Sequence, residues 1–477
     1  MAINDIFEIG RQGIEANRRA LSTTSQNVSN ANTPGYSRQR ANFSASAKSS
    51  TGGVTLGGGV QIDRVVRVHN DFVHGQILEE MKSHGGFKAR AEGLTRIEGQ
   101  VNEQGRQLSE QVTHFFNAFR ELSTNPEQQT LKLAAIQATE DVGRSFRKIN
   151  DALESLKKEI DINLGTVVDD INHLTREVAS LNQAIALNEA VRDVPNELLD
   201  RRELILRQLS SKLGFQTFYD ERGAASVVSG GAVLVQGSES NELTALRTPE
   251  KGNKGEGSVE IMLTDKYGNR NIPVRLEDGE LGGAIHIRDN VINVMLRQLD
   301  TAAYQLGTSV NKLQEQAVEL TGNSSIGLFT DLGEQVRGSA SRLGVSQQVR
   351  QDPEAFATGL TVAPGDNRVV LEISSLAEKP LMPEFFRSND VESRFTIGES
   401  INSLMGFLGS ETQRERQFFE SSDRVLSQLE NYRESISGVS LEEEAINMIQ
   451  YQHAFNAAAK ATKVGDELLQ TILSIKE

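Results

Sequence analysis

The stretch SQNVSNANTPGYSR, residues 25–38, ends the helical pattern of the first part of the chain. Proline resists the continuation of a helix, and the pair Pro34-Gly35 suits the two central positions of a type II turn. The first helix is therefore predicted to end near Asn30, and an extended segment is predicted to follow it.

Working outward from this turn, apolar residues precede it at intervals of seven positions. They are Phe7, Ile14, Leu21 and Val28, and the residues beside them are small or polar, such as Gly10, Gly13 and Ala20. An apolar stripe with this interval is typical of a coiled-coil-like helix, which needs a partner surface.

The other end of the chain carries a matching stripe. Ser440 lies three residues before Glu443, which is the spacing of a capping box, and acidic residues occupy the first turn that follows. A helix is therefore predicted to begin near Leu441. The C-terminal stripe consists of Leu441, Met448, Phe455 and Leu469, with Ile472 beside it.

Between the two stripes, segments predicted to be helical alternate with segments predicted to form strands. Strands are predicted at 37–70, and several long helices are predicted at 71–213, with a turn at Asn125-Pro126. Short runs of Val, Ile and Leu between Gly, Asp and Asn predict a β domain at 214–288. Helices are predicted again at 291–320 and 391–436, whereas 322–389 is irregular with strands.

The predicted fold class is therefore α+β and multidomain, with paired terminal helices, a long-helix bundle and a β-rich inserted domain. A chain of 477 residues is long enough for about three domains. The predicted divisions are 1–60 with 437–477 as a terminal axial helical domain, 61–213 with 290–320 and 391–436 as a helical bundle domain, 214–289 as the β-rich inserted domain, and 321–390 as a small irregular or β-containing region.

Composition excludes several classes of function. A net charge of -15 without a basic cluster argues against nucleic-acid binding. No apolar run is long enough for membrane insertion, and the first residues lack the pattern of a cleavable signal. The absence of cysteine excludes disulfides and thiolate metal sites, and leaves the redox compartment open.

Candidate catalytic and metal-ligating groups favour structural roles. The seven histidines do not have the spacing of helical metal ligands, and the glycine-rich segment near residue 58 has no phosphate-binding ending. Ser155 and Lys158 match a spacing found in acyl-transfer enzymes, but they lack the companion motifs. Asp200, Arg201, Arg202 and Glu203 are expected on a solvated helix face or in modest ion pairs. No enzymatic activity, metal or cofactor is predicted.

Two terminal motifs resemble one known family. Residues 25–38 are similar to the signature of flagellar rod, hook and hook-associated proteins, in which an Asn-rich Pro-Gly turn follows the first helix. SLEEEAINMIQYQHAFNAAAKATKVGDELLQTIL, residues 440–473, resembles the last helix of the same axial proteins. NELLDRRELILRQLSSKLGF at 196–215, GGAVLVQG and GELGGAIHIRDNV resemble the hook-associated members in particular. The turn residues that carry the first match are Asn30, Asn32, Thr33, Pro34, Gly35 and Tyr36.

The resemblance implies a structural part of the bacterial flagellum at the junction between hook and filament. The two apolar stripes would then form an inner helical layer, and the ends of a free subunit would become ordered on joining their neighbours. Implied partners are the hook protein, a second junction protein (hook-associated protein 3), other copies of the chain, an export chaperone and the flagellar type III export apparatus. The implied location is extracellular, with export that requires no cleaved signal.

Two alternatives remain at this stage. A hook or distal rod protein would carry the same ends, although it would lack the segment at 196–215. A secreted surface adhesin or enzyme could use the same export route, with its activity in the β-rich middle, although no catalytic constellation favours it. For the terminal stripes themselves, the alternative is an intramolecular coiled coil of an ordinary helical protein.

Overall fold

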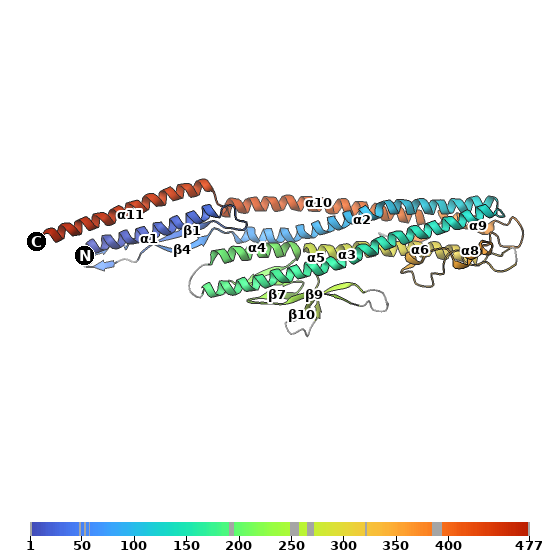
Figure 1. Ribbon diagram of the computed structural model, residues 1–477, viewed down its shortest axis with the longest axis horizontal. Helices are drawn as coiled ribbons and strands as arrows, with labels where there is room; N and C mark the ends of the chain where they lie inside the picture. Colours follow the sequence, from blue (N-terminus) through green and yellow to red (C-terminus); the bar gives the residue numbers. More distant parts are fainter. Residues whose placement is uncertain are drawn as a thin grey trace.

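The computed structural model describes residues 2–46, 49–51, 54–56, 58–189, 195–248, 257–264, 271–319, 322–383 and 394–475. The molecule is elongated, and both chain ends lie at the same extremity (Figure 1). Helices α1 (Ala2–Ser29) and α11 (Leu441–Ile475) lie side by side there, and longer helices form the remainder of the length. The predicted fold class and the pairing of the terminal helices are confirmed.

An arm of antiparallel strands follows α1. Strands β1 (Gln39–Ala45) and β4 (Val60–Arg67) pair with a register shift between Asn42 and Phe43. Between them, β2 (Ser49–Thr51) and β3 (Val54–Leu56) form a short hairpin. The predicted strands of residues 37–70 are thus present, and they lie beside α1 in Figure 1.

Long helices form the bundle. Helix α2 (Asp71–Thr124) begins where the Asn70 side chain accepts hydrogen bonds from the backbone N–H groups of Phe72 and Val73. Helix α3 (Gln129–Glu189) follows after the predicted turn, and α10 (Ile397–Ser437) packs along α2. Thr396 and Glu399 form a capping box at the start of α10, so this helix begins later than the predicted residue 391.

The first hydrophobic core lies between α2, α3, α6 (Asn293–Gln314) and α10. Its largest fully buried side chains are phenylalanines, and the ring centroids of Phe115 and Phe119 are 4.7 Å apart. Phe119 also meets Phe356 edge to face at 5.9 Å. Such aromatic clusters contribute both buried area and favourable ring geometry.

A second core lies between the later part of α3, helix α4 (Asn196–Lys212), helix α5 (Gly279–His286) and two small antiparallel sheets. One sheet has the order β5-β6-β7-β8 and the other β11-β10-β9. The strands are β5 (Gln216–Tyr219), β6 (Ala225–Ser229), β7 (Ala232–Gln236), β8 (Glu239–Ser240), β9 (Glu242–Arg247), β10 (Val259–Thr264) and β11 (Asn271–Pro273). The predicted β-rich segment is therefore present.

The predicted helix at 291–320 differs in detail. A π-helical segment, η1 (Ile287–Ile292), connects α5 to α6, and α6 ends at Gln314. Within η1, the Arg288 side chain pairs with Asp161 of α3 at 2.9 Å, and both side chains are almost fully buried. A π-helical turn changes which residues face a neighbouring helix, and an apolar pattern does not reveal it.

The segment at 322–383 contains more helix than the sequence predicts. It forms α7 (Ser339–Arg342), α8 (Gln347–Gln351), α9 (Arg368–Ser375) and the 3₁₀ turns η2 (Pro353–Ala355) and η3 (Leu376–Glu378). A two-residue strand, β12 (Met382–Pro383), pairs with β13 (Arg394–Phe395). Side chains such as Leu343, Phe356 and Ile373 enter the first core, so tertiary packing determines these short elements.

Candidate assembly site

Helices α1 and α11 run antiparallel and approach closely at glycines. A Cβ atom on Gly10 would lie 2.3 Å from Oγ1 of Thr462, and one on Gly13 would lie 3.2 Å from Cβ of Ala458. On the other helix, a Cβ atom on Gly465 would lie 3.3 Å from Ile6. The absence of a side chain at these positions allows the two backbones to come together.

The buried side of α1 lies next to the predicted apolar stripe rather than on it. Phe7, Ile14 and Leu21 are half-buried, and Val28 is 37% exposed. The buried positions of α1 are instead small or polar, namely Gly10, Gly13, Ala16, Ala20, Thr23, Thr24 and Asn27. The pair is therefore in contact mainly through small residues, with the larger apolar side chains at its margins.

The predicted stripe of α11 is similarly only partly covered. Met448, Phe455 and Leu469 are half-buried, and Leu441 is 56% exposed. Ile472 belongs to α11, but its side chain lies outside the described residues. The structure thus brings the two predicted stripes onto one helix pair, where much of their apolar surface remains accessible.

A second apolar line on α11 was missed by the sequence reasoning. Ile446, Ile449, Val464 and Leu468 are each between 45% and 65% exposed. Ile446 and Ile449 are three residues apart and Val464 and Leu468 are four apart, which is the spacing of a common helix face. This line was overlooked because the stripe with the seven-residue interval was taken as the apolar face of the helix. On α1, Ile9 is likewise 42% exposed.

The predicted turn has the expected geometry. The Tyr36 N–H donates to the carbonyl oxygen of Thr33 at 3.1 Å, and Gly35 has a φ of 81°, as the third position of a type II turn requires. The Thr33 hydroxyl lies 3.2 Å from Oδ1 of Asn30, while Asn32 and Pro34 are exposed. The turn redirects the chain from α1 into β1.

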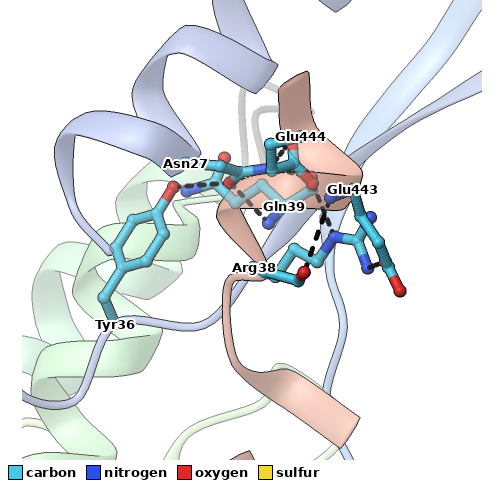
Figure 2. Close-up of polar contacts among 7 residues, drawn as sticks. Asn27, Tyr36, Arg38, Gln39, Glu443 and Glu444 are labelled. Atoms are coloured by element: carbon cyan, nitrogen blue, oxygen red, sulfur yellow. Dashed lines mark hydrogen bonds and ion pairs between the residues drawn. The ribbon is translucent and has the colours of Figure 1, made fainter. Parts of the chain in front are cut away.

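Asn27 is the centre of a buried polar network at the end of α1 (Figure 2). Its Oδ1 accepts hydrogen bonds from the Tyr36 hydroxyl and the Gln39 N–H, each at 2.9 Å. Its Nδ2 donates to the Gln39 carbonyl at 2.8 Å and to Oε2 of Glu444 at 3.1 Å. One amide therefore connects α1, the turn, β1 and the start of α11.

Arg38 completes this network from the other side. Its Nε donates to Glu444 and its Nη1 to Glu443, both at 2.7 Å. Its backbone N–H donates to the carbonyl of Ser437 at 2.8 Å, at the end of α10. Glu444 is 2% exposed, so its carboxylate is compensated by Arg38 and Asn27 within the protein rather than by water.

The surroundings of Tyr36 disfavour its ionised form. Burial, followed by the nearby carboxylates of Asp200, Glu197 and Glu444, raises the pKa of Tyr36 to about 12. A phenolate there would also lose the ability to donate to Asn27. The network therefore requires the neutral phenol.

The same region connects the strand arm to α4. The Ser37 N–H donates to Asp200 at 3.0 Å, and Arg67 of β4 pairs with Asp200 at 3.2 Å and with Glu203. Asn196 donates to the carbonyl of Val65 at 3.0 Å. These contacts attach the terminal helices and arm to the bundle.

The charges at 200–203 form ion pairs, as one of the two expectations had it, but only one of the four residues lies on a solvated face. Asp200, Arg202 and Glu203 are buried, and only Arg201 is exposed, where it pairs with Glu177. Arg202 donates to Asn182 at 3.0 Å and to the carbonyl of Gly223 at 2.6 Å. Contacts from β4 and from the turn before β6 cover the part of α4 that carries Asp200, Arg202 and Glu203.

Among the described residues, no group of three or more His, Asp or Glu side chains has the arrangement of a metal site. Within the same residues, no helix combines the length and the apolar character needed to cross a bilayer. The features that remain are the helix pair α1 and α11, its exposed apolar side chains and the polar network at its base.

Comparison with known proteins gives matches along most of this architecture. Residues 7–36 match the family described as flagella basal body rod protein, and residues 433–475 match the flagellar basal body rod FlgEFG protein C-terminal family. Residues 94–329 match the flagellar hook-associated protein FlgK helical domain. Paired terminal helices with these two end motifs define the class as the flagellar rod and hook axial proteins.

Curated relatives narrow the class. Flagellar hook-associated protein 1 of Bacillus subtilis is 29% identical, covering 98% of this chain and 97% of its own length. Its Escherichia coli counterpart is 24% identical, covering 99% of this chain and 100% of its own length. Over nearly its whole length, the chain is therefore similar to flagellar hook-associated protein 1.

A solved structure shares the fold. The flagellar hook junction protein FlgK from Burkholderia pseudomallei aligns with a TM-score of 0.66 at 13% identity, covering 76% of this chain and 100% of that one. At this identity the likeness concerns the fold, and it agrees with the arrangement of long helices and small sheets described above.

Proposed function

We propose that this chain is a structural subunit of the bacterial flagellum at the junction between hook and filament, and that it assembles through α1 and α11. The relatives that match its whole length are named hook-associated protein 1, and the related solved structure is named a hook junction protein. The observation that carries the mode of assembly is the exposed apolar surface on a helix pair whose own contact uses small residues.

The proposed assembly interface comprises the predicted stripes and the second apolar line of α11. Its members are Phe7, Ile14, Leu21, Val28, Leu441, Met448, Phe455, Leu469 and Ile472, together with Ile446, Ile449, Val464 and Leu468. Burial of an exposed aliphatic side chain contributes about 1.5–3 kcal/mol, so contacts from several neighbours would supply the ordering energy that the isolated pair lacks.

The proposed domain division follows the predicted ranges, with the terminal domain as the assembling part. Support comes from the two hydrophobic cores, one in the long-helix region and one beneath the sheets, and from the polar network at the base of the terminal pair. The proposed role is architectural rather than catalytic, in agreement with relatives that are hook-associated flagellar proteins.

Proposed neighbours are the hook protein, hook-associated protein 3 and further copies of this chain. The proposed location is outside the cell, reached through the flagellar type III export apparatus. An export chaperone that covers α11 fits this route, because exposed residues such as Ile446 and Ile449 would otherwise promote aggregation before assembly.

A deletion strain tests the junction role. Without this subunit, cells should build hooks but release filament protein into the medium, because the filament has no base on which to polymerise. Electron microscopy and immunoblotting of the medium measure the two outcomes. Normal filaments in the deletion strain would refute the junction assignment.

A surface variant tests the mode of assembly. The double change Ile446→Ser and Ile449→Ser should leave the melting temperature of the free chain nearly unchanged, because both side chains are more than half exposed, and should abolish filament attachment. Ile162→Ser on α3, where the side chain is 72% exposed, is the matched control and should assemble normally. Wild-type attachment by the double variant would reject this face of α11 as an interface.

A further inference from the structure

Helix α10 carries a line of apolar side chains that are about half exposed. Phe418, Val425 and Tyr432 recur at intervals of seven residues, and they are 45%, 40% and 54% exposed. We call these three residues the α10 strip. Phe418 meets Phe87 of α2 at a centroid distance of 5.3 Å, so the strip runs along one flank of the contact between α2 and α10. A seven-residue interval keeps side chains on one face of a helix, and the strip therefore forms a ridge.

The residues beside the α10 strip are uncharged. Ser421, Gln428 and Ser435 each follow a strip residue by three positions, which places them next to it on the helix surface, and all three are exposed. Protein interfaces are enriched in aromatic residues and poor in charge at their centres. Single exposed apolar residues need no partner, whereas two aromatic rings and a valine in line, with a neutral border, are typical of an interface.

A groove with a volume of about 530 Å³ lies between α2 and α3. Its walls are formed from residues 81–97 of α2 and residues 156–170 of α3, and Leu426 of α10 borders it. Apolar side chains such as Leu164 and Val167 of α3 contribute to its lining. The groove can therefore receive apolar side chains from another molecule, in the way that an amphipathic helix lies in an apolar groove.

The α10 strip and the groove lie on opposite flanks of the contact between α2 and α10. Ser422 is buried where its hydroxyl bonds Glu80 of α2, so it marks the line along which the two helices touch. Val425 follows Ser422 by three residues and Leu426 follows it by four, which places the two side chains on opposite sides of this line. One subunit therefore presents a ridge on one flank and a groove on the other.

The lengths and charges of the two features agree. Phe418 and Tyr432 are fourteen residues apart, so the α10 strip is about 21 Å long, and residues 156–170 of the groove also span about 21 Å. Arg424 lies beside the strip and Glu92 lies at the groove. Among the described residues neither has an ion-pair partner, so each can supply the opposite charge for the other at the rim of a contact.

We propose that the α10 strip of one copy of this chain inserts into the groove between α2 and α3 of the next copy. The proposal rests on the proposed function, which brings copies of the chain together in the flagellum. Because ridge and groove are different surfaces of one subunit, each copy can use both at once, and the contact repeats from copy to copy in a ring or helix. A contact of the strip with itself would instead stop at a pair.

Thiol crosslinking in assembled flagella tests this contact, because the chain has no cysteine of its own. A chain that carries both Val425→Cys, in the strip, and Asn163→Cys, in the groove, replaces the natural protein in a deletion strain. Isolated flagella are treated with a short bismaleimide crosslinker, which joins two thiols without the strict geometry of a disulfide. Immunoblotting should show a ladder of linked chains larger than a dimer, because each copy is joined to two neighbours.

Matched variants define the outcomes. Chains with Val425→Cys alone or Asn163→Cys alone should remain monomers, and so should a chain that combines Val425→Cys with Leu133→Cys, a position 46% exposed on α3 outside the groove. Monomers from the strip and groove pair, or dimers from Val425→Cys alone, would overturn the proposal. Absence of the unaltered chain from isolated flagella would instead refute the proposed function, so the two failures are distinguishable.

Discussion

The two ends of the molecule in Figure 1 differ in what their helices bury. Between α2, α3 and their neighbours, phenylalanines such as Phe115, Phe119 and Phe146 have no exposed surface. Between α1 and α11, glycine, alanine and threonine are buried, whereas Ile446 remains 65% exposed. The first core of the long-helix bundle therefore encloses its large apolar side chains, whereas the terminal pair leaves several of its own exposed.

The largest expected effect is a difference between the two regions in how much a side-chain truncation lowers the free energy of unfolding. Phe119→Ala should reduce the free energy of unfolding of the free chain by about 3–5 kcal/mol, because it leaves a cavity in a closed aromatic core. Leu441→Ala, at a position 56% exposed on α11, should change it by less than about 0.5 kcal/mol. Urea unfolding measures both, and similar losses would contradict the contrast between the regions.

The next effect concerns the base of the terminal pair. Asn27→Ala should cost about 2 kcal/mol in local stability, because it leaves the buried Glu444 carboxylate and the Gln39 backbone with fewer partners. Hydrogen exchange should show faster exchange in α1 and α11 and unchanged protection in α2. Asn32→Ala, at an exposed position of the same turn, is the control, and equal exchange in both variants would argue against a structural role for the network.

A smaller change tests the close approach of the two helices. Gly10→Ala should weaken the terminal pair by about 1 kcal/mol, because the added Cβ would lie 2.3 Å from Oγ1 of Thr462. A second change, Thr462→Ala, removes that atom and should restore hydrogen-exchange protection. Gly75→Ala, where a Cβ would meet nothing within 4 Å, should not weaken α2. Failure of the second change to rescue would reject steric contact as the cause.

The last expected effect appears only at high pH and concerns Tyr36. The pKa of Tyr36 is raised to about 12, from about 10 in an unfolded chain. Folding therefore favours the protonated phenol, so its contribution is fully present below about pH 10 and is lost as the pH rises through about 12. Hydrogen exchange in α1 should accelerate over this interval, and Tyr36→Phe should abolish that pH dependence. An unchanged dependence in the variant would assign it to another group.

The sequence was most informative where local chemistry determines structure. Pro34 and Gly35 predicted a type II turn, and Ser440 predicted the start of α11, because turns and caps depend on a few neighbouring residues. The sequence predicted that α1 and α11 pair, but it did not predict which residues bring them together. The close approach at Gly10 and Gly13 was missed, because glycine is usually a sign of flexibility rather than of close packing.

The remaining differences arise from contacts between distant segments. The burial of Asp200 and Glu203 was not predicted, because their ion-pair partner, Arg67, lies far away in the sequence. The short helices between residues 339 and 375 were missed because neighbouring helices complete their apolar environment. Neither periodicity nor propensity contains that information.

Helix α3 is common to both hydrophobic cores. Its 61 residues correspond to a rod of roughly 90 Å, with Leu153 in the first core and Leu174 in the second. Because a continuous helix resists bending, a force applied beneath the sheets would be transmitted along this rod to the opposite end of the subunit. In a rotating appendage, such a member would carry load between the two cores without a hinge midway.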